Sequence, residues 1–173
     1  TSQNEISPLL YGFTTDFYEA LVTSKFRKEL EDKYGKFLFD QAECSLKTFG
    51  EEVIPQLQEE NKLSSKYDKL IASAKIPFDG EERTLSQMVP YTQSKDRNIR
   101  KDAAKKVAEF FSANKHEFDE IYDKLVKVRT EIAHKLGFKN YVELAYARLR
   151  RLDYNAQDVA GYRKQVLENI VPL

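Results

Sequence analysis

Cysteine, histidine and tryptophan are scarce in this sequence, whose 173 residues include one cysteine, two histidines and no tryptophan. One cysteine cannot form an internal disulfide, which is typical of a reducing compartment, and we therefore interpret the chain as cytoplasmic. The chain also has no net charge, because 28 basic residues balance 28 acidic ones. No overall field attracts nucleic acid or an anionic membrane, and we expect neither as a partner.

Long apolar runs and export signals are lacking as well. No apolar stretch approaches the ~20 residues needed to cross a bilayer, and the polar start TSQNE does not have the basic-then-apolar order of a signal peptide. The sequence ends in the apolar run IVPL, without a capping glycine or a polar stop. Because such an end is unusual for a finished domain, we expect polypeptide to continue past residue 173.

The sequence is rich in apolar residues at three- and four-residue spacing, which is typical of helices. We predict an all-α fold in which residues 1–173 form a single multi-helix bundle of about seven to eight helices, with one short β-hairpin near residues 75–84. The first helix begins at Ser7-Pro8, a capping residue followed by proline. Its apolar stripe, which we expect to be core, consists of Leu9, Leu10, Phe13, Phe17, Ala20 and Leu21.

The next helices are apolar on more than one face. A short helix over residues 26–34 ends at Gly35, and the helix after it carries Phe37 and Cys44 opposite its main apolar face. A helix that is apolar on both sides usually lies between neighbours. We therefore predict that Cys44 is a packed small residue and not a nucleophile.

Turn and capping signals divide the rest of the chain. Residues 51–74 predict a helix with a candidate interruption at residues 61–65, and the dipeptide Asp79-Gly80 is the hairpin signal. Capping pairs open three further helices, the first of which we expect to end before Tyr91. These pairs are Thr84 with Gln87, Asn140 with Glu143, and Asn155 with Asp158.

A long apolar periodicity runs over residues 96–136. It predicts either one helix of ~60 Å or two helices broken near residues 112–114. Gly137, with Phe138 behind it, is typical of a helix end with its hydrophobic contact.

The histidines do not form a zinc motif. His116 and Glu120 have the one-turn spacing of two metal ligands, but a site needs a third ligand and the other histidine is His134. Eighteen residues on a continuous helix are ~27 Å, so the two imidazoles cannot share an ion there. We predict no catalytic residue, no metal ligand and no bound cofactor in this chain. A degenerate metal site at His116 and Glu120 is the alternative.

One cluster near the end of the chain combines guanidiniums, phenols and a carboxylate. Such a cluster can orient a peptide or a carboxylate terminus, and its residues are the candidates for substrate binding. The alternative is an Arg–Asp lock that ties two helices together. The candidates are Tyr146, Arg148, Arg150, Arg151 and Tyr154, with Asp153 as the carboxylate of the lock.

At this cluster the sequence resembles a known family. The run LGFKNYVELAYAR over residues 136–148 and its continuation over residues 151–173 resemble the segment that leads into the catalytic region of oligoendopeptidase F. The run LIASAKIPFDGEERTLSQM over residues 70–88 is similar to the inner N-terminal part of the same enzymes, and the likeness extends from about residue 6 to residue 173.

The resemblance implies a zinc metallopeptidase of the thimet-oligopeptidase-like family, a helical two-lobed protein that cleaves short peptides inside a deep channel, usually in the cytoplasm. In that family a His-Glu-x-x-His motif and a downstream glutamate hold zinc, and later histidine and tyrosine residues support the oxyanion. None of these has a counterpart in residues 1–173. The resemblance therefore implies a non-catalytic part of the substrate-enclosing lobe, with the zinc, the oligopeptide substrates and the catalytic domain belonging to the intact enzyme.

The alternative is a self-sufficient helical scaffold that grips a partner helix with the stripe of residues 96–136. The two interpretations predict different surfaces. A part of a larger enzyme should leave apolar area exposed around Phe37, Cys44 and the C-terminal helix, and can self-associate through it. A finished module should bury those residues.

Overall fold

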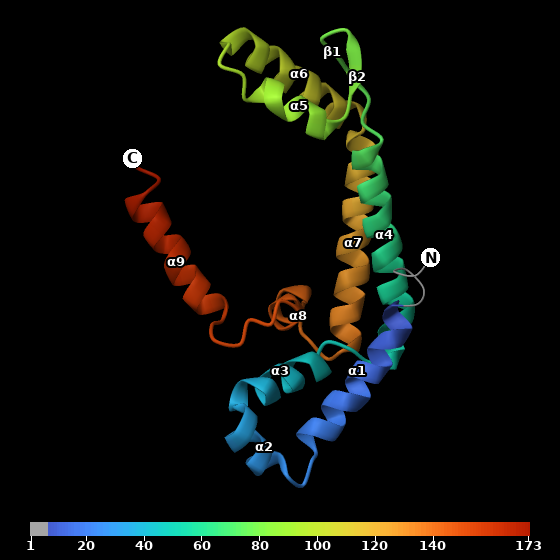
Figure 1. Ribbon diagram of the computed structural model, residues 1–173, viewed down its shortest axis with the longest axis vertical. Helices are drawn as coiled ribbons and strands as arrows, with labels where there is room; N and C mark the ends of the chain where they lie inside the picture. The colour runs from blue at the N-terminus through green and yellow to red at the C-terminus, as the bar shows by residue number, and fades with distance from the viewer. Residues whose placement is uncertain (1–6) are drawn as a thin grey trace. The chain divides into compact units, whose positions relative to one another are not determined.

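The computed structural model describes residues 7–173, with side chains from residue 12 onward. Within these residues the fold is all-α apart from one β-hairpin, as the sequence predicts, and it has nine α-helices where seven to eight are expected (Figure 1). The elements are α1 (Ser7–Val22), α2 (Arg27–Tyr34), α3 (Lys36–Leu46), a 3-10 turn (Glu51–Val53), α4 (Ile54–Ala72), β1 (Ile76–Phe78), β2 (Glu81–Arg83), α5 (Leu85–Thr92), α6 (Arg97–Ala113), α7 (Lys115–Lys135), α8 (Tyr141–Arg148) and α9 (Ala156–Asn169).

The chain divides into two compact units. The first combines the residues up to Gln58 with Arg129–Leu173, and the second is Glu59–Val128. The boundaries fall inside α4 and α7, so each of these helices contributes to both units. No helix within the described residues is both long enough and apolar enough to cross a membrane.

The first unit is built around α3, which packs against α1, α2 and α8. Arg27 ties α2 to α3, because its guanidinium lies 2.8 Å from a carboxylate oxygen of Glu31 and 2.7 Å from one of Glu43. Burying a large apolar side chain contributes about 1.5–3 kcal/mol, so the buried set stabilises this unit. Its buried apolar residues are Phe39, Ala42, Cys44, Val53, Leu57, Ile132, Ala133 and Leu144.

The prediction that the apolar stripe of the first helix forms core is wrong for the part of it that the structure describes. Phe13 is 73% exposed and Phe17 is 60% exposed, and Ala20 is also exposed. Leu21 alone among the described members is half-buried, while Leu9 and Leu10 lie outside the described side chains. The half-buried face of α1 contains Gly12, Thr15, Tyr18 and Val22. Apolar and small residues occur on two faces of this helix, so packing against α3 selects the face that periodicity alone does not.

The second unit contains the hairpin, and its turn forms where the sequence predicts it. Strands β1 and β2 pair antiparallel, with Phe78 opposite Glu81. Asp79 and Gly80 have φ angles of 53° and 77°, the left-handed values that a two-residue I′ turn requires. The hairpin packs with α5 and α6 around a small core. That core consists of buried Ile76, Met88 and Ala103, with Phe78, Leu85, Tyr91, Val107 and Phe110 packed against them.

Helix limits follow local signals in most places. α4 runs without a break through residues 61–65, so the predicted interruption is wrong, and buried Leu63 lies in that stretch. The periodicity of residues 96–136 is divided into two helices at Asn114, whose side chain donates to the carbonyl oxygen of Phe110 at 2.8 Å. α5 continues through Tyr91 to Thr92, slightly beyond its predicted end.

The predicted caps at Thr84, Asn140 and Asn155 are confirmed, while the one predicted at Ser7 lies outside the described side chains. The capping boxes of α5 and α9 are both complete, and the Asn140 side chain accepts hydrogen bonds from the first turn of α8. Gly137 ends the α7 segment with a φ of 80°, and the Phe138 N–H donates to the carbonyl oxygen of Ala133 at 2.9 Å. These bonds satisfy backbone groups that a helix end otherwise leaves unpaired.

Candidate functional site

The histidines and carboxylates of the described region do not fit a zinc ion. Nδ1 of His116 lies 3.9 Å from Oε1 of Glu120, and the His116 side chain is 88% exposed. His134 is in the last turn of the continuous helix α7, eighteen positions away. No group of three or more histidine, cysteine or acidic side chains within residues 7–173 is placed to hold an ion. Zinc takes about four ligands at ~2.0–2.3 Å, and this donor set does not supply them.

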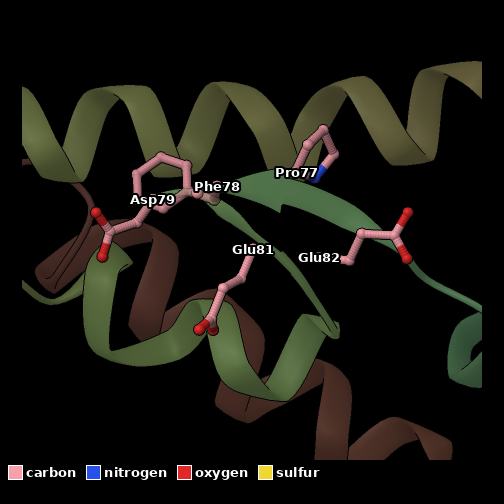
Figure 2. A pocket seen from close by; sticks show the side chains of 6 residues that line it. Pro77, Phe78, Asp79, Glu81 and Glu82 are labelled. Carbon is pink, nitrogen blue, oxygen red and sulfur yellow. The ribbon is translucent and has the colours of Figure 1, made fainter.

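An open hollow of about 390 Å³ lies along the hairpin and is lined by residues 77–82 (Figure 2). The carboxylates of Asp79, Glu81 and Glu82 point in different directions around it, as Figure 2 shows. The guanidinium of Arg83 lies 3.6 Å from the Asp79 carboxylate and 3.4 Å from that of Glu81. The hollow therefore lies at a charged turn, and the carboxylate side chains of Asp79, Glu81 and Glu82 are largely exposed to solvent.

The structure brings three of the five candidate residues into contact. The Arg151 guanidinium lies 4.5 Å from the centre of the Tyr146 ring and 5.7 Å from that of Tyr154. The two rings meet edge to face at 6.4 Å. A guanidinium against aromatic faces gains about 0.5–1 kcal/mol at exposed sites and more where water is excluded. Arg151 and its two tyrosines therefore form one cluster, which we call the Arg151 cluster.

The other two candidates lie apart from the Arg151 cluster. Arg148 is placed over the ring of Tyr141 at 5.9 Å, where Arg129 of α7 also lies at 5.5 Å. Arg150 is exposed and has a φ of 52°, which is unusual for a residue with a β-carbon. The structure thus separates the three arginines into three different environments.

The end of α8 explains how Arg151 reaches Tyr146. The Arg150 N–H donates to the carbonyl oxygen of Ala147 at 2.9 Å, and the Arg151 N–H donates to that of Tyr146 at 3.0 Å. These are the two bonds of a Schellman ending, in which Arg150 takes the left-handed position usually given to glycine. Such endings commonly carry a hydrophobic contact between the residues that hold the positions of Arg151 and Tyr146, and here a cation–π stack replaces it.

The predicted Arg–Asp lock does not form at Asp153. The neighbours of the Arg151 guanidinium are the rings of Tyr146 and Tyr154, and no ion pair joins Asp153 to an arginine in the part of the chain that the structure describes. A stacked guanidinium keeps the N–H donors around its edge, which match the two oxygens of a carboxylate. The arrangement can therefore present donors to an acidic group while its faces stay packed.

Sequence reasoning missed two contacts around α8. Tyr141 and Arg148 are seven positions apart, which places them on one helix face and is a usable signal. Arg129, which shares the Tyr141 ring, comes from another helix and has no local signal. The contact of Cys44 with Ala147 also joins distant segments, and it confirms that Cys44 is a packed residue.

Comparisons with known proteins agree with this architecture. Residues 2–49 match the family described as the Peptidase M3 N-terminal domain. A comparison with curated proteins gave no match. Over residues 2–49 the chain is therefore similar to the M3 peptidases, and over nearly its whole length it is similar to a segment of solved proteins named as oligoendopeptidase F.

Three solved structures are similar over 98% of this chain, each with a TM-score of 0.93. One is named as an oligoendopeptidase F from Bacillus anthracis str. Ames, with 58% identity, and the chain covers 31% of it. A second, also named as an oligoendopeptidase F, is 56% identical, and PZ peptidase A with an inhibitor is 57% identical; the chain covers 30% of each. The chain therefore spans about a third of the length of these relatives.

Proposed function

We propose that this chain is a non-catalytic part of a zinc-dependent oligoendopeptidase and forms part of the wall that encloses short peptide substrates. The observation that carries the proposal is the identity of 56–58% over 98% of the chain, with the same fold, to proteins about three times as long. The proposed location is the cytoplasm, which fits a chain with one buried cysteine.

The side chains of this chain support a role in peptide binding and not in hydrolysis. Zinc, when bound in such an enzyme, polarises the scissile carbonyl and activates water. The described residues of this chain do not fit as a ligand set for it, so the proposed contributions are binding and enclosure of the peptide. Hydrolysis is then assigned to polypeptide that corresponds to the part of the relatives, about two-thirds of their length, that this chain does not cover.

The Arg151 cluster is the proposed peptide contact in that wall. Its guanidinium is held by Tyr146 and Tyr154 and has donors at its edge, which suit a peptide carboxylate. Arg150 and Arg148 add positive charge nearby in the sequence, although neither stacks on these two rings.

The surface of the first unit favours a part of a larger enzyme over a self-sufficient scaffold. Phe37 is exposed, and α9 has no buried residue, as expected for a part of a larger enzyme. Cys44, which was expected at the same surface, is buried instead, because α3 packs against α8 at that position.

The test is a comparison of two proteins with internally quenched fluorescent oligopeptides. One is the 173-residue chain, and the other is the Bacillus anthracis relative with the matching 31% replaced by this chain. We expect no hydrolysis by the chain with added zinc, and hydrolysis by the chimaera that a chelator abolishes and zinc restores. Chelator-sensitive hydrolysis by the chain alone would contradict the proposal, as would a folded chimaera that is inactive while the relative is active.

A further inference from the structure

Helix α9 presents an apolar surface that the first unit leaves without a fully buried residue. None of its side chains is buried. Tyr162 is 67% exposed, Leu167 is 64% exposed, and Ile170 just beyond the helix is 60% exposed. Exposed apolar side chains that occur singly need no explanation, whereas a contiguous set indicates an interaction site.

The apolar residues of α9 lie on one face of the helix, on which Tyr162, Leu167 and Ile170 are exposed while Val159 and Val166 are half-buried. Val159, Tyr162, Val166 and Ile170 follow one another at spacings of three, four and four, which places them on a single stripe, and Leu167 lies beside it. We call these five residues the α9 stripe.

The opposite face of α9 is polar. It carries Lys164 and Glu168, which form an ion pair at 3.8 Å, and Gln165. The helix is therefore amphipathic, with a polar side suited to water and an apolar side that is at most half-buried.

The N-terminal end of the helix is held by local contacts. Asn155 and Asp158 form a complete capping box there, and the Arg151 cluster orders the chain just before it. Capping contributes about 1 kcal/mol, and isolated helices shorter than ~12–15 residues are marginal in water. A helix of 14 residues without a fully buried side chain therefore needs a covering surface for stability much beyond its cap.

We propose that the α9 stripe is the surface onto which the remaining two-thirds of an oligoendopeptidase F-like polypeptide docks. This inference rests on the proposed function. The solved relatives share this segment at 56–58% identity and continue for about twice its length beyond the matched part, so they contain the polypeptide that is available to cover it.

The charge pattern of the stripe favours such a partner over a second copy of this chain. Arg163 is exposed and lies between Ile170 and Leu167 on the helix surface, inside the apolar arc. A symmetric contact between two copies would bring two Arg163 side chains toward the symmetry axis, and like charges there disfavour it. A different surface can place a carboxylate opposite Arg163 within an apolar groove.

Hydrogen–deuterium exchange of α9 tests the inference in the chain and in the chimaera described above. We expect the amides of α9 to exchange at least about tenfold more slowly in the chimaera, because docking suppresses the local unfolding of the helix through which its amides exchange. Helix α6, whose Ala103 is already buried in the second unit, is the internal control and should change little. Equal exchange of α9 in the two proteins overturns the inference, and it does so whether or not the chimaera hydrolyses peptides.

A matched pair of variants in the chimaera separates the two faces of α9. Leu167→Asp places a charge within the α9 stripe, and Gln165→Asp places the same charge on the polar face. Loss of α9 protection in the first variant alone supports the inference, and equal effects of the two overturn it. Concentration-dependent protection in the chain, with a dimer mass by light scattering, would identify a second copy as the occupant and overturn it too. A chimaera with protected α9 but no hydrolysis would contradict the proposed function and leave the docking surface standing.

Discussion

The thiol of Cys44 donates a hydrogen bond to the backbone carbonyl oxygen of Ala147 at 3.4 Å, although 103 positions separate the two residues. This bond joins α3 to the last turn of α8, and the helix that carries the Arg151 cluster is thereby fixed to the core of the first unit. A small side chain at position 44 allows the two helices to approach, which explains a buried cysteine without assigning it chemistry.

Replacing Cys44 by alanine should destabilise the chain by about 1 kcal/mol, because a small buried volume and a weak hydrogen bond are both lost. Urea unfolding followed by far-ultraviolet circular dichroism measures the change. Cys44→Ser is the matched control, since its hydroxyl can still donate to Ala147, and it should cost less than the alanine variant. An alanine variant as stable as the parent chain would show that the contact contributes nothing.

Replacing Arg151 by lysine should loosen the connection between α8 and α9 while the charge is retained. A lysine ammonium cannot stack flat on Tyr146 and Tyr154, so we expect a loss of about 0.5–1 kcal/mol and faster amide exchange in residues 149–155. Arg163→Lys, on exposed α9, makes the same chemical change and should leave both quantities unaltered. Equal behaviour of the two variants would argue against a structural role for the stack.

Replacing Arg150 by glycine should stabilise the protein. Its φ of 52° costs a residue with a β-carbon about 1 kcal/mol, a cost that glycine does not carry. Thermal unfolding should therefore shift upward by a few degrees at most, since glycine also adds freedom to the unfolded chain. Gly137→Ala, at the equivalent position of the α7 ending with a φ of 80°, should shift it downward. A downward shift in both variants would contradict the assignment of strain to Arg150.

Burial, and then the hydrogen bond that its hydroxyl donates to Asp79 at 3.2 Å, raise the pKa of Tyr91 above its ordinary value of about 10. The unfolded chain then releases this proton at a lower pH than the folded one. The stabilisation is therefore complete below about pH 10 and is lost as the pH rises through the folded-state pKa. The phenolate absorbance of the parent chain and of Tyr91→Phe can be followed during an alkaline titration. The difference between the two curves should show a tyrosine that ionises above the ordinary pKa. A difference curve centred at or below the ordinary value would contradict the shift.

Local signals in the sequence are enough to predict most helix limits. The capping pairs Thr84 with Gln87 and Asn155 with Asp158, and the left-handed turn at Asp79-Gly80, appear in the structure where they are predicted. Each depends on atoms a few positions apart, so its energy is largely independent of the rest of the fold. The exposed side of α1 is the contrary case, since Phe13 and Phe17 form a regular stripe that α3 does not cover.

The candidate site also depends on contacts that local sequence patterns do not predict. The sequence placed five residues in one cluster because they are near neighbours along the chain, and the structure brings together Tyr146, Arg151 and Tyr154 but not Arg148 and Arg150. The sequence also suggested an ion pair with Asp153, which the structure replaces by ring stacking after the helix ending at Arg150 turns the backbone. Charge and spacing indicate which groups are close, whereas backbone direction determines which of them meet.

The sequence by itself determined the all-α class, the hairpin, the caps and the resemblance to oligoendopeptidase F, since each of these is encoded in short-range patterns or in continuous runs of residues. The tertiary structure alone decided which face of α1 is covered, that Cys44 meets Ala147, and that α9 is left with an open apolar stripe. The physical reason is that helix formation depends on neighbours within about a turn, while burial depends on which other helix arrives at each face.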